Sequence, residues 1–372
     1  MQSEFAKLFR RWFASVDHTL LFTIFAILAI GIWVSIASTP AVAMKLGFTP
    51  FHFVKQHVII APIAGIIVVF VSFLQARHIR LLSVLGYVLC IAFVVGTIFF
   101  GTEIKGARRW LNIFGFSFQP SEFLKPVITI ITAWLLSEQY RDRRFPGIVL
   151  SIVSITLVVP LLLLQPDVGM TVVIVGTWFA QLFISGLSIF MIFAFAALAI
   201  CAMLGLYFTL PHFADRIDRF LAPGEDADLF QVHKSLEAFK SGGFFGKGPG
   251  EGIVKNVVPD AHSDFVFSVI GEEFGFIACL LVITLFIIFI AKAISKIMQS
   301  SSIFSFSAVF GVLFQIALQV LINVCTALNL IPTKGMTLPF ISYGGCSMLA
   351  TAISFGIALS LTKKTSLNRE NV

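Results

Sequence analysis

Long apolar stretches alternate with short polar intervals from residue 18 almost to the end of the chain. A bilayer core about 30 Å thick needs about 20 apolar residues per helix, and the stretches are of about this length. The pattern therefore predicts an all-α polytopic integral membrane protein with about ten transmembrane helices. Their approximate cores are Leu20–Ser38, Val58–Phe73, Leu81–Phe100, Pro120–Leu136, Ile148–Leu164, Val168–Phe183, Leu187–Leu210, Phe265–Ile290, Ile303–Leu328 and Leu338–Leu361.

Two polar interruptions shape this ten-span membrane domain, which we expect to comprise residues 18–362. Segment 211–263 is predicted to form one long outer loop between spans seven and eight. Gln165, Pro166 and Asp167 separate spans five and six, because a proline and a carboxylate break an otherwise continuous apolar run.

The first residues predict an amphipathic helix. Its apolar positions recur at helical spacing and are Phe5, Leu8, Phe9, Trp12, Phe13 and Val16. We expect residues 1–17 to form a cytoplasmic helix on the inner leaflet, and residues 363–372 to form a cytoplasmic tail. The cations favour this orientation, since thirteen Lys and Arg would lie in cytoplasmic pieces and six in short outer loops.

The composition excludes several classes of protein. The 372-residue chain is 58% hydrophobic and only 12% charged, against about 25% charged in an ordinary soluble domain, so a soluble enzyme is excluded. The net charge of +7 does not indicate nucleic-acid binding, because the 26 Lys and Arg are dispersed between apolar runs. The five cysteines fall inside apolar runs without metal-type spacing, and we interpret them as small core residues.

Prolines, glycines and carboxylates concentrate in the predicted outer segments, so we expect any chemistry on the outer face. Glu122 and Lys125 would lie one helical turn apart at the start of the fourth span. They fit either an ion pair that joins two helices or a site for an anionic ligand. Arg109, in a short outer loop, fits either lipid-phosphate anchoring or substrate binding. Arg216 and Arg219 fit either a fork for phosphate oxygens or pairing with neighbouring aspartates.

Asp264 stands at the mouth of the eighth span, directly after His262 and Ser263. This position suits helix capping or a general base, and the residues alone leave both interpretations open. Glu272 and Glu273 follow, about 100° apart on the helix, so we expect that they do not both face one site.

Two segments rich in glycine or proline are irregular. Between Pro332 and Gly345, two prolines and two adjacent glycines predict a broken start to the tenth span, which lines a cavity and includes the cation Lys334. Segment 242–252 is not a P-loop, because Lys247 is followed by Gly and not by Ser or Thr. A mobile or close-packed surface loop is expected there.

These motifs together resemble the SEDS family of bacterial cell-wall polymerases, from about residue 100 to the C-terminus. The matching segments are Gly106–Trp110, Phe118–Lys125, Gln165–Asp167, Pro259–Phe265, Gly271–Gly275 and Leu338–Gly345. Pro332–Gly335 and Ala261 are more similar to the division members of the family than to the elongation members. The departures are Ser263, where Thr is common, and Cys346, where Ser is usual, and neither removes a required functional group.

The resemblance implies a SEDS-type ten-span fold and glycosyl transfer from lipid II at the outer face of the bacterial inner membrane, with undecaprenyl pyrophosphate as the leaving group. It implies that Asp264 is the essential acidic residue. The expected substrate and pyrophosphate site comprises Arg109, Glu122, Lys125, Arg216, Arg219 and Lys334. The expected supporting residues are Gln119, Pro120, Asp167, His262, Ser263, Glu272, Ser342 and Tyr343. The implied partners are membrane lipids, a class B penicillin-binding protein and other divisome proteins at the septum.

The residue types fit this chemistry. Asp264 can take a proton from the acceptor hydroxyl as it attacks the anomeric carbon, which predicts inversion. Cations can neutralise the departing pyrophosphate, with or without a divalent metal ion, and no organic cofactor is expected. Three alternatives stay open: a lipid II flippase, an elongation polymerase of the same family, and a scaffold that recruits a transpeptidase. A flippase would need a comparable polar path toward the inner face, and the inner loops hold no matching motif cluster.

Overall fold

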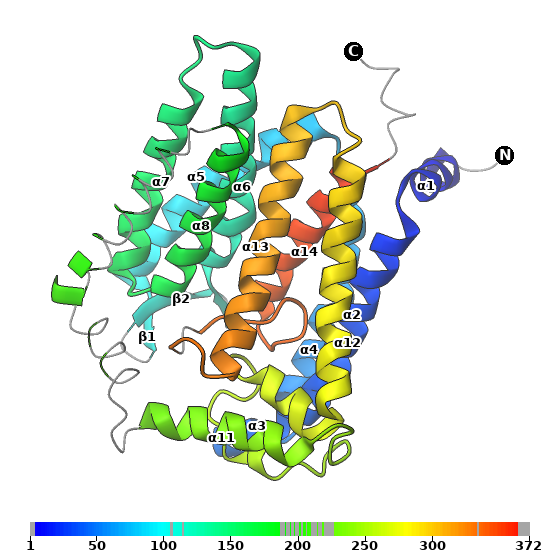
Figure 1. The fold of residues 1–372 in the computed structure, drawn as a ribbon, viewed down its shortest axis with the longest axis vertical. Helices are drawn as coiled ribbons and strands as arrows, with labels where there is room; N and C mark the ends of the chain where they lie inside the picture. The colour runs from blue at the N-terminus through cyan, green and yellow to red at the C-terminus, as the bar shows by residue number, and fades with distance from the viewer. Residues whose placement is uncertain are drawn as a thin grey trace.

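A computed structural model of the chain describes residues 4–104, 107–113, 115–186, 227–332 and 335–363, with scattered positions between 190 and 218. The predicted seventh span and the first part of the long outer loop therefore lie largely outside the described residues. The other nine predicted spans are helices along one bundle (Figure 1). They are α2 (His18–Ser38), α4 (His52–Phe73), α5 (Ala76–Phe100), α6 (Pro120–Arg141), α7 (Gly147–Leu164), α8 (Val168–Ile184), α12 (Val266–Ile297), α13 (Ile303–Ala327) and α14 (Gly345–Leu361).

The bundle has the composition of a multi-pass membrane protein. Six of the described helices, α2, α4, α5, α7, α12 and α13, are long and apolar enough to cross a membrane. Helices α8 and α14 are shorter apolar helices, and α6 carries charged residues at both ends. The main group of buried apolar side chains lies where α2, α4, α12, α13 and α14 pack together, and a second lies among α5, α6, α7 and α8. The predicted polytopic fold is confirmed.

The two ends of the bundle differ in structure (Figure 1). The α1 end carries the predicted N-terminal helix, α1 (Glu4–Ser15). There the Trp12 ring stacks on Phe73 with centroids 4.9 Å apart, and its Nε1 donates to Ser72 Oγ at 2.8 Å. The opposite end, here called the α11 end, carries α3 (Pro40–Lys45), α11 (Ala227–Gly242) and the 3₁₀ helix η1 (Val254–Asn256). All motifs of the predicted outer face that the structure describes lie at the α11 end.

Between α5 and α6 the chain forms a small antiparallel sheet in place of the expected short loop. Its strands β1 (Thr102–Ile104), β2 (Ala107–Ile113) and β3 (Phe116–Phe118) lie in that order. Aromatic and β-branched residues favour strands, and Gly115 supplies the positive φ of the second turn. The sheet places Arg109 on its central strand.

Helix α12 is interrupted at Gly275, which has φ +79° and ψ −178°. The glycine-rich segment 242–250 packs against this break and bonds its free backbone groups. The N–H of Phe276 donates to Gly243 O at 2.9 Å, and the N–H of Gly248 donates to Glu273 O at 3.0 Å. Of the two forms expected for this segment, the structure has the close-packed loop. The 22 residues after the break rise about 33 Å, which is enough to span a bilayer core without the first part of α12.

Replacing Gly275 by alanine should destabilise the protein, since a Cβ there would meet Gly246 N and Phe244 O at a positive φ. We expect a loss of about 1–3 kcal/mol from backbone strain, seen as a lower melting temperature of the purified protein in detergent. Gly96 in α5 is the matched control, because its Cβ would face open space and alanine favours a helix. Equal melting temperatures for the two variants would contradict the interpretation of the break.

Candidate active site at the α11 end

Four of the predicted site residues form two ion pairs, here called the charged cluster. Lys125 Nζ lies 2.7 Å from Glu122 Oε2 in the first turns of α6. Arg109 Nη1 on β2 lies 3.4 Å from Asp167 Oδ1 before α8, and Arg109 Nε donates to Gln165 O at 2.9 Å. The charges of Glu122 and Lys125 also act on the Asp167 carboxyl. Three separate chain segments thus bring the cluster together.

Only one cation of the charged cluster is accessible. The Lys125 side chain is 2% exposed, whereas the Arg109 side chain is 23% exposed. Among the described residues, Lys125 Nζ has no hydrogen-bond partner beyond its ion pair. Burial raises the pKa of the Asp167 carboxyl, and the Arg109 guanidinium opposes that shift. Arg109 can therefore touch a ligand directly, while Lys125 acts on it through the low-dielectric interior.

The start of α6 explains how the sequence fixes this cluster. Pro120 occupies the first helical turn, where its missing N–H costs nothing, and Gln119 stands at the N-cap. Glu122 then falls in the first turn, where the helix dipole stabilises a negative charge. Gln119 Nε2 donates to Ser121 Oγ at 3.3 Å. The predicted supporting residues Gln119 and Pro120 thus shape the helix start.

Asp264 ends a tight loop, residues 260–264, directly before α12. The N–H groups of Ser263 and Asp264 donate to Asp260 O at 3.0 and 3.1 Å. Phe265 occupies the N-cap of α12, and its side chain offers no capping hydrogen bond. The N-cap considered for His262 and Ser263 therefore falls on Phe265 instead, while both interpretations of Asp264, stabilisation of the helix start and general base, remain predictions. The Asp264 side chain is half-buried.

The segment before α14, residues 335–344 and here called the connector, joins the Asp264 loop to the first turn of α14, which in turn contacts the chain before α6. Ser342 Oγ accepts from Leu338 N at 2.8 Å and donates to Ser263 O at 2.6 Å. Tyr343 N donates to His262 O at 2.8 Å. On its other side, Cys346 Sγ accepts a hydrogen bond from Gln119 N at 3.4 Å and donates to Ser117 O at 3.4 Å. The broken start predicted for the tenth span is confirmed.

Glu272 and Glu273 bind the same segment, so the expectation that they do not share a site is wrong. Glu272 accepts hydrogen bonds from Val254 N at 2.8 Å and Lys255 N at 2.7 Å. Glu273 accepts from Gly250 N at 3.1 Å and pairs with Lys255 Nζ, which also donates to Ala37 O at 3.0 Å. The physical reason is that the chain at 250–255 wraps around the start of α12 and reaches both carboxylates. These residues hold the loop that leads to Asp264.

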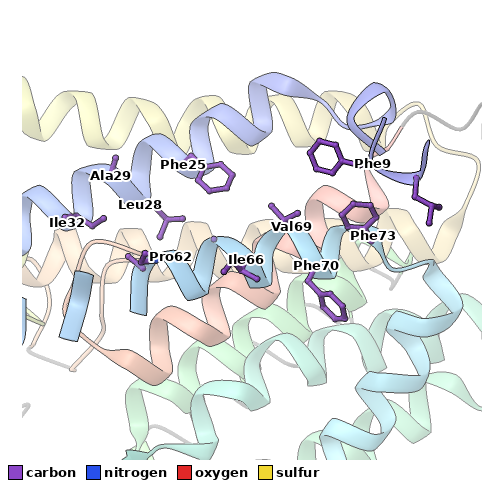
Figure 2. Close-up of a pocket in the computed structure, with 13 residues that line it drawn as sticks. Phe9, Phe25, Leu28, Ala29, Ile32, Pro62, Ile66, Val69, Phe70 and Phe73 are labelled. Atoms are coloured by element: carbon purple, nitrogen blue, oxygen red, sulfur yellow. The ribbon is translucent and has the colours of Figure 1, made fainter. Parts of the chain in front are cut away.

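The remaining candidates and cavities add nothing to this site. Arg216, Arg219 and Lys334 lie outside the described residues. Within the ranges that the structure describes, no group of three or more His, Cys, Asp or Glu side chains is placed to hold a metal ion. A groove of about 820 Å³ between α2 and α4 is lined only by apolar side chains, among them Phe25, Ile66 and Phe73 (Figure 2). It offers no group for catalysis.

Sequence reasoning missed two residues that position the site. Asn323 Nδ2 donates to Asp264 O at 3.1 Å and to Met336 O at 2.6 Å, and so joins α13 to the Asp264 loop and the connector. Cys346 links the first turn of α14 to the start of α6. Asn323 could have been found, because an amide within the apolar ninth span is costly unless it has partners. Cys346 differs from the Ser that is usual in the resembled family, but a lone cysteine beside an apolar run does not by itself indicate a bridging role.

Comparison with known proteins assigns the family. A family model described as a cell cycle protein, covering FtsW, RodA and SpoVE, matches residues 18–367. The chain is 38% identical to "Probable peptidoglycan glycosyltransferase FtsW" of Caulobacter vibrioides, over 95% of this chain and 90% of that protein. It is 33% identical to the protein of the same name from Legionella pneumophila, over 93% of this chain and 90% of that protein.

Solved structures agree with the sequence relatives. A chain from a peptidoglycan synthase complex that coordinates polymerization and crosslinking superposes with a TM-score of 0.78 at 25% identity, over 93% of this chain and 97% of that chain. The rod shape determining protein RodA of Thermus thermophilus gives a TM-score of 0.66 at 26% identity, over 93% and 96%. The chain therefore belongs to the SEDS family, the family of FtsW, RodA and SpoVE.

Proposed function

We propose that the protein is a peptidoglycan glycosyltransferase that polymerises lipid II into glycan strands for septal wall synthesis during cell division. The names of its relatives support this activity and the division role. The observation that carries the proposal is that the half-buried Asp264 and the charged cluster lie at the same end of the bundle. The connector bonds to the Asp264 loop, and Cys346 in α14 bonds to the chain before α6. A glycosyl transfer that releases pyrophosphate needs these two kinds of group together.

The protein would be a multi-pass protein of the inner membrane, located at the division septum. Its α11 end would face outward, and both termini would lie in the cytoplasm. The distribution of Lys and Arg supports this orientation. The amphipathic α1 at the other end suits the inner leaflet, because its exposed Leu8, Phe9 and Phe13 can enter the lipid surface. The site then meets lipid-linked substrate at the outer surface.

In the proposed reaction Asp264 is the general base. The acceptor hydroxyl attacks the anomeric carbon of the donor as its proton passes to the carboxylate. The bond between that carbon and the pyrophosphate oxygen breaks, and undecaprenyl pyrophosphate leaves with the bonding electron pair. A single displacement inverts the anomeric centre. No strong general acid is needed, because pyrophosphate is a stable anion.

The charged cluster would stabilise the pyrophosphate as its negative charge grows. Arg109 is the accessible contact, and the fixed Glu122–Lys125 pair sets the field behind it. In the proposed mechanism, a divalent cation bound to the pyrophosphate of the substrate supplies a second positive charge. Titration with EDTA followed by Mg²⁺ in the polymerisation assay measures that contribution.

Arg109→Ala should lower kcat/KM for lipid II about 10- to 100-fold, because the transition state would lose the stabilisation of one or two charge-assisted hydrogen bonds. Arg108→Ala is the matched control, because Arg108 is 55% exposed and pairs only with the surface residue Glu103 among the contacts described for it. The control should keep its kcat/KM within about twofold. An equal loss in the two variants would show that general loop stability, and not the charged cluster, controls the rate.

A class B penicillin-binding protein is the proposed partner, together with other divisome proteins. The similarity to a chain of a complex that coordinates polymerization and crosslinking supports this pairing. Glycan strands leaving this site would be crosslinked by the transpeptidase of such a partner.

The test of the proposed function is polymerisation of labelled lipid II by the purified protein in detergent, with and without the partner transpeptidase. Glycan ladders are the expected product. Transport of lipid II across liposome membranes, without ladders under either condition, would overturn the proposal in favour of the flippase. Ladders with retained anomeric configuration would overturn the single-displacement mechanism alone.

A further inference from the structure

Three aromatic rings lie together at the Asp264 loop, and none of them belongs to the charged cluster. Phe53 of α4 stacks on His262, with centroids 5.7 Å apart and planes at 15°. Tyr343 of the connector lies 4.9 Å from Phe53 and 5.6 Å from His262 between centroids. All three rings are half-buried, so part of each stays accessible. We call this group the aromatic platform.

The aromatic platform is fixed relative to Asp264. His262 lies two residues before Asp264 in the same tight loop, and its carbonyl accepts from Tyr343 N at 2.8 Å. The Tyr343 hydroxyl donates to Gln56 Oε1 on α4. These bonds tie α4, the Asp264 loop and the connector together, so a ligand on the platform would be held at a set place near the carboxylate.

His57 gives an independent sign that this region receives a polar ligand. Its side chain is 1% exposed, its ring lies 6.5 Å from the Tyr343 ring, and neither ring nitrogen has a hydrogen-bond partner among the described residues. Buried polar groups are nearly always hydrogen-bonded, and one left alone costs free energy. The partner of this ring therefore comes from outside the described side chains, as water or as a polar group of a ligand.

We propose that the aromatic platform binds one pyranose ring of the lipid-linked substrate, an assignment that rests on the proposed function. A hexopyranose with equatorial substituents presents C–H groups on its faces and hydroxyls on its edge. The C–H groups suit the negative faces of aromatic rings, and the edge suits the exposed amide of Gln56. The pyrophosphate would lie at the charged cluster and the sugar on the platform. The platform is a positioning element and takes no part in proton transfer.

The test replaces Tyr343 and follows two constants in parallel: KM for lipid II, and the inhibition constant of undecaprenyl pyrophosphate, which carries no sugar. Tyr343→Leu should raise KM about tenfold, in the range of an aromatic stacking contact, while the inhibition constant changes less than about twofold. Tyr343→Trp keeps an aromatic face and should recover most of the loss. Tyr140→Leu is the matched control, because Tyr140 is 72% exposed at the far end of α6.

Several outcomes would overturn the assignment. An unchanged KM in a folded Tyr343→Leu variant would overturn it. An equal rise of KM and of the inhibition constant would also overturn it, because it would indicate a general loss of structure. If that variant does not fold, Phe53→Leu at a half-buried position carries the same expectations. Wild-type protein that makes no glycan in this assay would reject the proposed function itself, so the two failures are distinguishable.

Discussion

Asp264→Asn should lower kcat for lipid II polymerisation by about 10²- to 10⁴-fold, the usual contribution of a general base. The amide keeps the size of the carboxylate and cannot take the proton of the acceptor hydroxyl. The loop should keep its shape, because Asn keeps the size of Asp and the bonds from Ser263 N and Asp264 N to Asp260 O, and from Asn323 to Asp264 O, use the backbone. KM should therefore change little, and melting temperature in detergent should match that of the wild type.

A pH profile separates the base from a merely positioning carboxylate. In the wild type, kcat/KM should fall in acid as the base becomes protonated, and the residual rate of Asp264→Asn should lose that fall. Asp142→Asn is the matched control, since Asp142 lies at the end of α6 near the α1 end and should keep the wild-type profile. Asp264→Asn with a tenth or more of the wild-type kcat would rule out the assigned role.

Lys255→Met should lower the free energy of unfolding by about 3–5 kcal/mol, because it leaves the Glu273 carboxylate buried without its counter-charge. The Glu273 side chain is fully buried and the Lys255 side chain is 9% exposed. The bond from Lys255 Nζ to Ala37 O, which joins η1 to α2, would also be lost. Denaturant unfolding of the purified protein in detergent, followed by tryptophan fluorescence, measures this loss.

A second substitution distinguishes an unpaired charge from lost packing. The double variant Lys255→Met with Glu273→Leu removes both charges, so it should recover most of the lost stability. Lys7→Met is the control, because the Lys7–Glu4 pair on α1 is exposed, with its charged atoms 3.0 Å apart, and is worth less than about 1 kcal/mol. A double variant no more stable than Lys255→Met would refute the ion-pair explanation.

The spans were predictable because hydropathy depends on composition over about 20 residues, and a lipid-facing helix needs no particular partner. Helix α7 (Gly147–Leu164) agrees with its predicted core to within one residue. The break at Gly275 was not predictable, because the residues on both sides of it are apolar. Its cause is a distant loop that replaces the missing helical hydrogen bonds, and hydropathy does not report such contacts.

The candidate site was predictable as a set of residue types and not as an arrangement. Motif spacing singled out Asp264 and Lys125, since charges at the start of a membrane helix are costly and rarely incidental. Their connection depends on Ser342, Asn323 and Cys346, which bridge segments as much as 229 residues apart. These hydrogen bonds depend on how the helices pack against one another, so they cannot be predicted from the order of residues in a single sequence.

The loop that packs against the break in α12 also constrains how the protein enters the membrane. Phe276 and Ile277 begin the part of α12 that is long enough to span, and their N–H groups bond to carbonyls of 242–250. In the proposed orientation that loop must be translocated before those bonds can form. During synthesis the outer end of α12 would therefore arrive at the bilayer with unpaired amides and remain hydrated. Insertion of this helix is completed only when an already exported segment folds back onto it.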